Sequence, residues 1–356
     1  MNTATRPKVA FCRLLLCLFF AAPAMSPLLA QTGGINIFKF LNLPASARIT
    51  GLGGYQLTQA DGDVAMAYAN PALLNIAQHQ QLSLSHSFFP GNIQYGNVAY
   101  GHWITPWKVA LQGGVHYVNY GMMDRTDEFE QVNGQFKARE NALTIGASKA
   151  LYERLTVGIN LRFISAAYDN YQSTAFSSDI GALYRDTASG FSVALVGRHL
   201  GAQLGTFRPD NRETLPFEMQ LAVSQQLSHL PFRFSVVYRY LNRWNVLYDD
   251  PNIAEPINFD GETIPDIRHP WIENFFRHFV FNGEFFFGAR ENIRFRIGYN
   301  HMQRKELSID NYRTLAGFSF GLGFKVKRFR LDYGRGTYHA AGSSNHLTIA
   351  TPLDFF

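Results

Sequence analysis

The sequence predicts an all-β protein: a fourteen-stranded antiparallel transmembrane β-barrel of the outer membrane with an N-terminal plug. Three observations predict this fold class. A secretory signal opens the chain, apolar and polar residues alternate through most of the remaining sequence, and the connections between the alternating stretches differ in length in a regular way. We expect a signal peptide over residues 1–30, a plug over residues 31–80 and the barrel over residues 81–356.

The first thirty residues have the three parts of a secretory signal peptide. A basic stretch over residues 6–13 precedes an apolar run over residues 14–22, and small residues come after that run. Cleavage after Ala30 is expected, and cleavage after Ala24 is the alternative because Ala22 and Ala24 fit the A-x-A rule better.

Composition narrows the classes of function. Cys12 and Cys17 both lie in the signal, so the mature chain has no thiol for a disulfide, for catalysis or for a zinc site. The formal charge of +5 includes three cations of the signal and no acid, which leaves 5 − 3 = +2 for the mature chain. No basic cluster interleaved with aromatics occurs, so nucleic acid is not an expected partner.

No run of 18 apolar residues occurs after the signal, so no transmembrane helix is expected.

Short stretches of period-two alternation define the strands. In one of them Ile293, Phe295 and Ile297 alternate with Arg294 and Arg296. Period two sends each apolar set to one face of a strand and each polar set to the other. Counting such stretches gives an even number, as single-chain bacterial barrels require. We expect the strands near residues 81–89, 93–102, 108–119, 140–151, 154–168, 174–185, 190–200, 214–227, 232–244, 275–287, 291–301, 315–324, 326–333 and 346–356.

The connections predict the orientation of the barrel. Those after even strands are short, and those expected over residues 120–139, 201–213, 245–274, 302–314 and 334–345 are long. Short periplasmic turns and longer outer loops are typical of outer-membrane barrels, whereas a soluble sandwich has no reason to sort its loops this way. Two pairs of tryptophans, Trp103 with Trp107 and Trp244 with Trp271, indicate opposite interfacial belts.

The inward face of the strands carries many charges. Such charges are tolerated only where they pair with each other or with water, so we expect an ion-paired polar lumen. The arginines are expected to hold the barrel together, and the alternative is that they line a substrate path. The expected lumen network comprises Arg162, Asp179, Glu218, Arg233, Arg239, Glu284, Arg294 and Arg296.

Residues 31–80 do not alternate and are rich in glycine and other small residues, as in backbone that packs closely inside something else. The stretch ends in the turn sequence Asn70-Pro71-Ala72. A glycine-rich N-terminal plug that ends in Asn-Pro-Ala and precedes fourteen strands resembles the FadL superfamily of outer-membrane barrels. Within that superfamily, residues 38–48, the Ala-rich sequence up to residue 74 and the terminal residues 354–356 are similar to a barrel of the type IX secretion system.

This resemblance implies a non-enzymatic role. It implies an outer-membrane anchor that holds the surface protein PorZ, together with PorU and PorV, in an attachment complex. That complex removes sorting domains from secreted cargo and links the cargo to lipopolysaccharide. The alternative function is a FadL-like channel for small hydrophobic molecules, against which the polar lumen argues.

One motif suggests catalysis. Residues 317–321 match the G-x-S-x-G nucleophile elbow, but Ser319 lies in an unbroken alternation with no helix pattern after it. A hydrolase that uses Ser319 is therefore the third hypothesis. We expect no catalytic residue, no metal and no cofactor.

Two of the expected outer loops are acidic. Surface loops carry function, so we expect these loops to form the docking surface for a partner. Calcium binding and a merely solvated loop are the alternatives, and no D-x-D-x-D spacing supports calcium. The expected docking residues are Asp127 and Glu128 in the first loop and Asp249, Asp250, Glu255, Asp260 and Asp266 in the second.

Overall fold

The computed structural model describes residues 36–209, 211–247, 270–288, 291–307, 315–339 and 342–353. The expected signal peptide and the expected docking residues between 249 and 266 lie outside the described residues.

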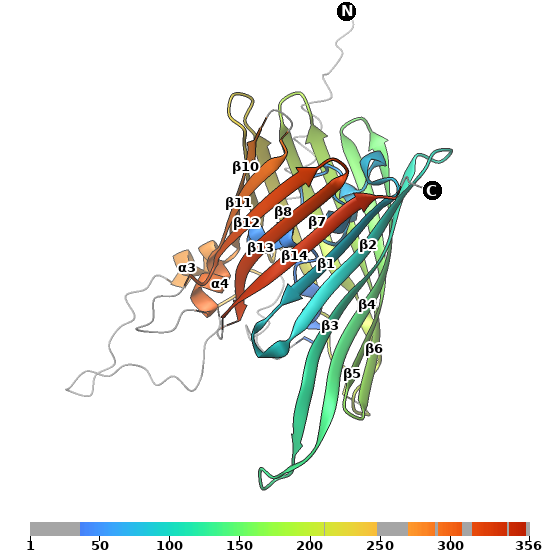
Figure 1. Cartoon of the computed structure of the whole chain (residues 1–356), viewed down its shortest axis with the longest axis vertical. Helices are drawn as coiled ribbons and strands as arrows, with labels where there is room; N and C mark the ends of the chain where they lie inside the picture. The colour runs from blue at the N-terminus through green and yellow to red at the C-terminus, as the bar shows by residue number, and fades with distance from the viewer. Residues whose placement is uncertain are drawn as a thin grey trace, which may run out of the picture.

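Fourteen strands form a closed antiparallel barrel, as Figure 1 shows. Each strand pairs with its neighbours in sequence, and β1 closes the wall by pairing with β14. The predicted fourteen-stranded antiparallel barrel is therefore confirmed. The strands are β1 (Gln81–Phe88), β2 (Gln94–Ile104), β3 (Val109–Thr126), β4 (Val132–Tyr152), β5 (Leu155–Tyr168), β6 (Tyr171–Asp186), β7 (Phe191–Gly205), β8 (Glu218–Gln226), β9 (Phe232–Tyr238), β10 (Phe279–Phe287), β11 (Ile293–Asn300), β12 (Phe318–Val326), β13 (Phe329–His339) and β14 (Gly342–Pro352).

The wall is taller on one side than on the other. Strands β3 to β7 have 14 to 21 residues, whereas β8 to β12 have 7 to 9. The prediction of a loop over residues 120–139 is wrong, because β3 and β4 continue pairing as far as Thr126 and Val132. Both faces of this extension contact solvent, so its sequence lacks the alternation that marks a wall strand. The β3–β4 hairpin projects well beyond the rest of the barrel (Figure 1).

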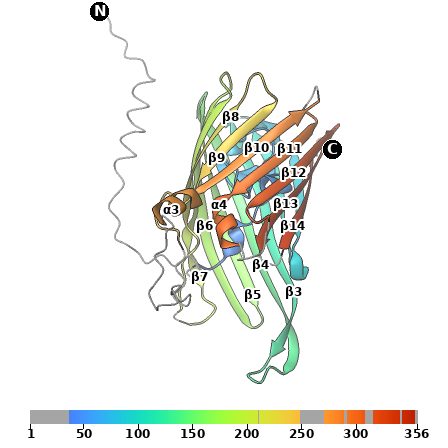
Figure 2. The same ribbon diagram turned by 90° about the vertical axis from the view of Figure 1, so that its left-hand side faces the viewer.

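Two short helices lie at the end of the barrel that also carries the β3–β4 hairpin (Figure 2). They are α3 (Pro270–Arg277) and α4 (His301–Glu306), and they contact each other. The expected strand start at residue 275 is wrong because α3, with its Glu273–Arg277 ion pair at 2.7 Å, extends to Arg277. No helix among the described residues is long and apolar enough to cross a membrane.

Short turns connect the described strands at the opposite end. The connections over residues 105–108, 153–154, 187–190 and 327–328 have two to four residues. The first residue of β1 and the last of β14 also lie there, paired as Gln81 with Pro352. We assign this end to the periplasm, since short periplasmic turns are the rule in such barrels.

The outward face of the wall is apolar. Residues that face out, such as Phe163, Phe281 and Ile349, keep between 39% and 49% of their surface exposed, although a soluble protein would bury them. Their strand neighbours of opposite parity, such as Arg162 and Asn282, are buried. This pattern indicates a wall surrounded by lipid.

Residues 36–80, which we call the inner segment, pack against the inward side of the wall. Their short helices contact strands on opposite sides, since α2 (Ala47–Gly51) contacts β11 to β14, and η3 (Pro71–Leu73) contacts β4 to β6. Wall glycines permit this approach: a Cβ on Gly158 would meet the Pro71 carbonyl carbon at 2.6 Å. The other turns are η1 (Lys39–Asn42), η2 (Val64–Tyr68), η4 (Ile76–Gln78) and, outside the inner segment, η5 (Pro90–Asn92).

Candidate functional site

Arg48 is the fully buried centre of a network of ion pairs in the interior. The side chain of Ser46 caps the helix that carries it by accepting a hydrogen bond from the Ile49 N–H. The Arg48 guanidinium donates to Asp61 Oδ1 at 2.7 Å and to Glu284 Oε2 at 3.0 Å. One arginine therefore joins two parts of the inner segment to strand β10 of the wall.

The network continues through the wall and returns to the inner segment. Glu284 Oε1 accepts from Arg296 Nε at 2.7 Å, and Arg296 Nη1 donates to Asp332 Oδ1 at 2.6 Å. Arg330 contacts Asp332 at 3.1 Å and Asp63 at 2.7 Å. We call this set the Arg48 network. Its nine members are Arg48, Asp61, Asp63, Arg233, Glu284, Arg294, Arg296, Arg330 and Asp332.

The charges of the Arg48 network nearly balance, since it contains five arginines and four carboxylates. Burial alone would raise the pKa of Asp61, but the charge and hydrogen bonds of Arg48, together with Arg233 and Arg294, hold that pKa well below its ordinary value. The carboxylate is therefore ionised wherever its partners are in place. Removing one partner of a buried pair leaves an uncompensated charge and costs about 3–5 kcal/mol.

A second buried pair lies on the taller side of the wall. Arg162 in β5 and Asp179 in β6 are 2.5 Å apart. Arg162 also donates to the Tyr68 carbonyl oxygen at 2.7 Å and lies 4.3 Å from the centre of the Tyr68 ring. The Asp179 carboxylate accepts the His199 N–H at 2.9 Å, where β7 bulges and His199 has a φ of 57°. This pair therefore holds both the inner segment and the bulge.

A third pair lies on the shorter side. Arg239 comes directly after β9 and donates to both carboxylate oxygens of Glu218 in β8, at 2.8 and 2.9 Å. Its guanidinium also lies 4.0 Å from the ring centre of Tyr55 in the inner segment. Such two-point pairing fixes the orientation of the guanidinium as well as its position.

The structure divides the eight expected lumen residues among these three sites. Arg162 pairs with Asp179, and Glu218 pairs with Arg239. The remaining four belong to the Arg48 network; they are Arg233, Glu284, Arg294 and Arg296. In each site at least one arginine contacts the inner segment.

Sequence reasoning missed five members of the Arg48 network. Arg48, Asp61 and Asp63 lie in the irregular inner segment, where no periodicity marks a buried face. Arg330 and Asp332 share the inward parity of β13, so the alternation that identified the other strands contained the signal for them.

The expected plug motif is a buried turn. The Asn70 side chain accepts the Ala72 N–H at 3.0 Å and donates to the Leu57 carbonyl oxygen at 2.7 Å. Pro71 begins η3, which packs against β4, β5 and β6. The motif therefore fixes the course of the inner segment against the taller side of the wall.

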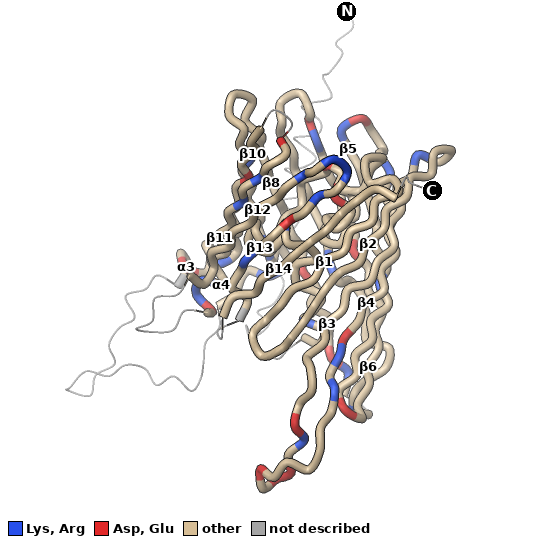
Figure 3. The backbone as a smooth tube through the Cα atoms, viewed as in Figure 1, with Lys and Arg blue, Asp and Glu red and all other residues tan. Residues whose placement is uncertain are grey.

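Two of the expected docking residues, Asp127 and Glu128, are described, and both lie at the tip of the β3–β4 hairpin. Asp127 Oδ1 accepts hydrogen bonds from the N–H groups of Phe129 and Gln131 at 2.9 and 3.0 Å, and it thereby shapes the turn. Glu128 is exposed beside it. Figure 3 shows acidic residues gathered at this tip.

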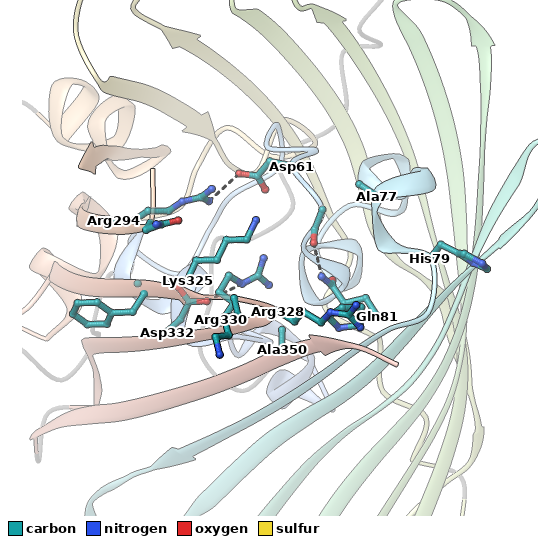
Figure 4. A pocket seen from close by; sticks show the side chains of 16 residues that line it. Asp61, Ala77, His79, Gln81, Arg294, Lys325, Arg328, Arg330, Asp332 and Ala350 are labelled. Atoms are coloured by element: carbon teal, nitrogen blue, oxygen red, sulfur yellow. Dashed lines mark hydrogen bonds and ion pairs between the residues drawn. The ribbon is translucent and has the colours of Figure 1, made fainter. Parts of the chain in front are cut away.

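Two polar cavities open at the short-turn end. The first has a volume of about 440 Å³ and lies between the inner segment and strands β11 to β14, as Figure 4 shows. The second, of about 350 Å³, is lined by residues 185–190 and by residues 58–61. Asp61 lines both cavities, so the Arg48 network reaches each of them.

No family model and no curated protein matches the chain. Solved structures of outer-membrane barrels do match. The toluene transporter TbuX of Ralstonia pickettii aligns with a TM-score of 0.50 and 10% identity, over 88% of this chain and 98% of that chain. The chain has the fold of the FadL-like outer-membrane barrels.

Two further FadL-like barrels align at similar levels. The monoaromatic hydrocarbon channel CymD has a TM-score of 0.49 and 14% identity, over 88% of this chain and 97% of that chain. A FadL homologue of Pseudomonas aeruginosa has a TM-score of 0.48 and 10% identity, over 86% of this chain and 98% of that chain. The expected localisation is confirmed: the chain is a multi-pass β-barrel of the outer membrane.

Proposed function

We propose that this FadL-like barrel is a non-catalytic mount in the outer membrane that holds a protein partner at the cell surface. The observation that carries the proposal is the Arg48 network, which ties the inner segment to β10, β11 and β13. A passage along this side of the interior would have to pull apart buried ion pairs that join the inner segment to the wall. On this proposal the inner segment is a plug.

The sequence similarity over residues 38–74 supplies the candidate system. It is a similarity to PorQ, the outer-membrane component that anchors PorZ in the type IX secretion system. The proposed partner is therefore PorZ, with PorU and PorV in the same attachment complex. Cargo joined to lipopolysaccharide would be the product of that complex.

The β3–β4 hairpin is the proposed docking element. It reaches beyond the wall at the outer end, so a partner can approach it without contacting the membrane (Figure 1). Its tip combines the carboxylates of Asp127, Glu128 and Glu130 with Phe129, whose side chain is 77% exposed. An exposed aromatic anchor inside a charged rim is a frequent composition of binding hot spots.

The hairpin proposal is tested by shortening the hairpin. Met122 pairs with Lys137, so an Asn-Gly turn in place of residues 123–136 closes the ladder without disturbing the wall. We expect a barrel with normal heat-modifiable mobility that retains at least tenfold less PorZ at the cell surface. The separate deletion of residues 249–266 tests the second acidic loop. Unchanged PorZ retention in both variants would contradict a docking role for these loops.

A channel for small hydrophobic molecules is the second candidate, favoured by the fold likeness to the toluene transporter TbuX. The two functions differ in what purified protein does in vesicles. A mount should leave toluene entry into proteoliposomes at the rate of empty liposomes, whereas a channel should raise that rate. Opening the Arg48 network by Arg48→Met should increase entry only if a path exists behind it.

The proposed role needs no catalytic residue. Ser319 is the second residue of β12, where it pairs with Gly298 and Gly336, and its side chain is buried. Its side chain interacts with Tyr338. We expect Ser319→Ala to leave lipid release from membranes at the wild-type level, and a loss of release would favour the hydrolase hypothesis.

A further inference from the structure

The larger cavity at the periplasmic end, which we call the cationic cavity, has an unbalanced lining. Five cations contribute to it, from β11, β12, β13 and the turn between the last two, against two carboxylates. The cations are Arg294, Lys325, Lys327, Arg328 and Arg330, and the carboxylates are Asp61 and Asp332. Arg328 has a further polar or charged partner, and the other four cations exceed the two lining carboxylates by two. This positive charge faces a concave space large enough for a small anionic group.

Two of these cations are held in place by the Arg48 network. Arg294 lies 3.3 Å from Asp61, and Arg330 lies 2.7 Å from Asp63. Both guanidinium groups are therefore oriented before any ligand arrives, which reduces the entropy lost on binding. Their remaining N–H groups are donors of the kind that phosphate oxygens accept.

Lys325 adds a third cation to the same place. Figure 4 shows its ammonium group between the guanidinium groups of Arg294 and Arg330. Lys325 makes no ion pair with any described residue, although three like charges in one place repel each other. An anion between them would replace this repulsion with three charge-assisted contacts.

The cavity lies where the lipid-facing surface ends. Phe324 contributes to the lining, and it is 44% exposed on the outward face between its register partners Ile293 and Leu331. Beyond this apolar row the chain turns at residues 327–328, and exposed Trp107 marks the interface level at the same end of the barrel. The cavity itself opens on the inward side of the wall, so a lipid with its acyl chains against this row would reach it by extending its headgroup around the short turn at residues 327–328.

We propose that the cationic cavity binds the phosphate of an anionic phospholipid headgroup from the inner leaflet of the outer membrane. Arg294 and Arg330 are the fixed donors, and Lys325 and Lys327 close over the phosphate from the rim. This site is independent of the surface partner, so the two proposals can fail separately. The bound lipid would hold the barrel's periplasmic rim at the inner leaflet.

The test is lipid retention by the purified full-length barrel, measured by native mass spectrometry with phosphatidylglycerol and with phosphatidylcholine. We expect phosphatidylglycerol to be retained at least tenfold more strongly. The double variant Lys325→Gln, Lys327→Gln should lose most of this preference, because both side chains are exposed at the rim and the Arg48 network stays intact. Lys108→Gln is the matched control, a cation in another short turn that does not line the cavity.

Three outcomes would overturn the proposal. The first is equal retention of the two lipids by the wild-type protein. The second is an unchanged preference in the double variant and in the charge reversal Lys327→Glu. The third is saturable binding of inorganic phosphate with no retained lipid, which would assign the cavity to a free anion. Heat-modifiable mobility of each variant shows that the barrel is folded before its lipid is measured.

Discussion

Arg48 decides how firmly the inner segment is held. Its side chain is fully buried and contacts Asp61 and Glu284, so a neutral residue at this position leaves buried carboxylates without their main partner. We expect Arg48→Met to lower the free energy of unfolding by about 3–5 kcal/mol. Urea unfolding in lipid vesicles, followed by tryptophan fluorescence, measures the change.

The matched control for Arg48 is Arg125 in the β3–β4 hairpin. Arg125 also forms an ion pair, with Asp169, but its side chain is 43% exposed. Exposed pairs contribute about 0–1 kcal/mol, so Arg125→Met should lie within that range. Equal losses in the two variants would mean that burial does not set the strength of the Arg48 network.

The sequence predicted most of the inward charges of the Arg48 network that strands carry, although it missed Arg330 and Asp332 in β13. Parity alone identified Arg162, Glu284 and Arg296, because a barrel strand has only two faces. It could not identify Arg48 or Asp61, since their burial depends on long-range packing of a segment without periodicity. Only the fold reveals that these two groups lie together.

Strand β5 and the inner segment are in close backbone contact. A Cβ on Gly158 would meet backbone atoms of Pro71 and Ala72 at 2.6 and 2.7 Å, whereas a Cβ on Gly113 would meet nothing within 4 Å. We expect Gly158→Val to cost about 1–3 kcal/mol through overpacking. Gly113→Val, in the same kind of strand, should change stability by about 0.5 kcal/mol or less. A tolerated Gly158→Val would show that the inner segment is not packed against β5.

The assignment of the two ends can be tested because the expected mature chain has no cysteine. Phe129→Cys at the hairpin tip should react with a membrane-impermeant maleimide in intact cells. Lys108→Cys in a periplasmic turn should react only after the outer membrane is opened. Labelling of Lys108→Cys in intact cells would contradict the assignment of this end to the periplasm.

The predicted first and last residues of the strands agree with the structure where the apolar–polar alternation is regular. They differ from it where the alternation ends. The first and fifth expected strands keep both limits within one residue, whereas most of the others gain or lose residues mainly at their outer ends. The β3–β4 hairpin was missed because two solvent-exposed faces remove the alternation, and α3 was missed because Phe275 and Phe276 precede β10 without a break in apolar character. Backbone pairing, not side-chain pattern, decides these limits.

The whole molecule combines a lipid-facing wall with an interior fixed by buried ion pairs. On the taller side Arg162 contacts Tyr68, and on the shorter side Arg239 contacts Tyr55, so the inner segment is held from both sides. The hairpin at one end and the cationic cavity at the other give the barrel a proposed attachment point on each side of the membrane. This arrangement suits a mount better than a conduit.

The most direct test of the mount proposal is a pull-down of the intact barrel from cells in a gentle detergent, with quantitative mass spectrometry of the proteins and small molecules that accompany it. If the barrel is a mount, PorZ should be recovered in an amount comparable to the barrel, together with PorU and PorV. Recovery of the barrel alone, with a small hydrophobic molecule bound in its interior, would contradict the proposal.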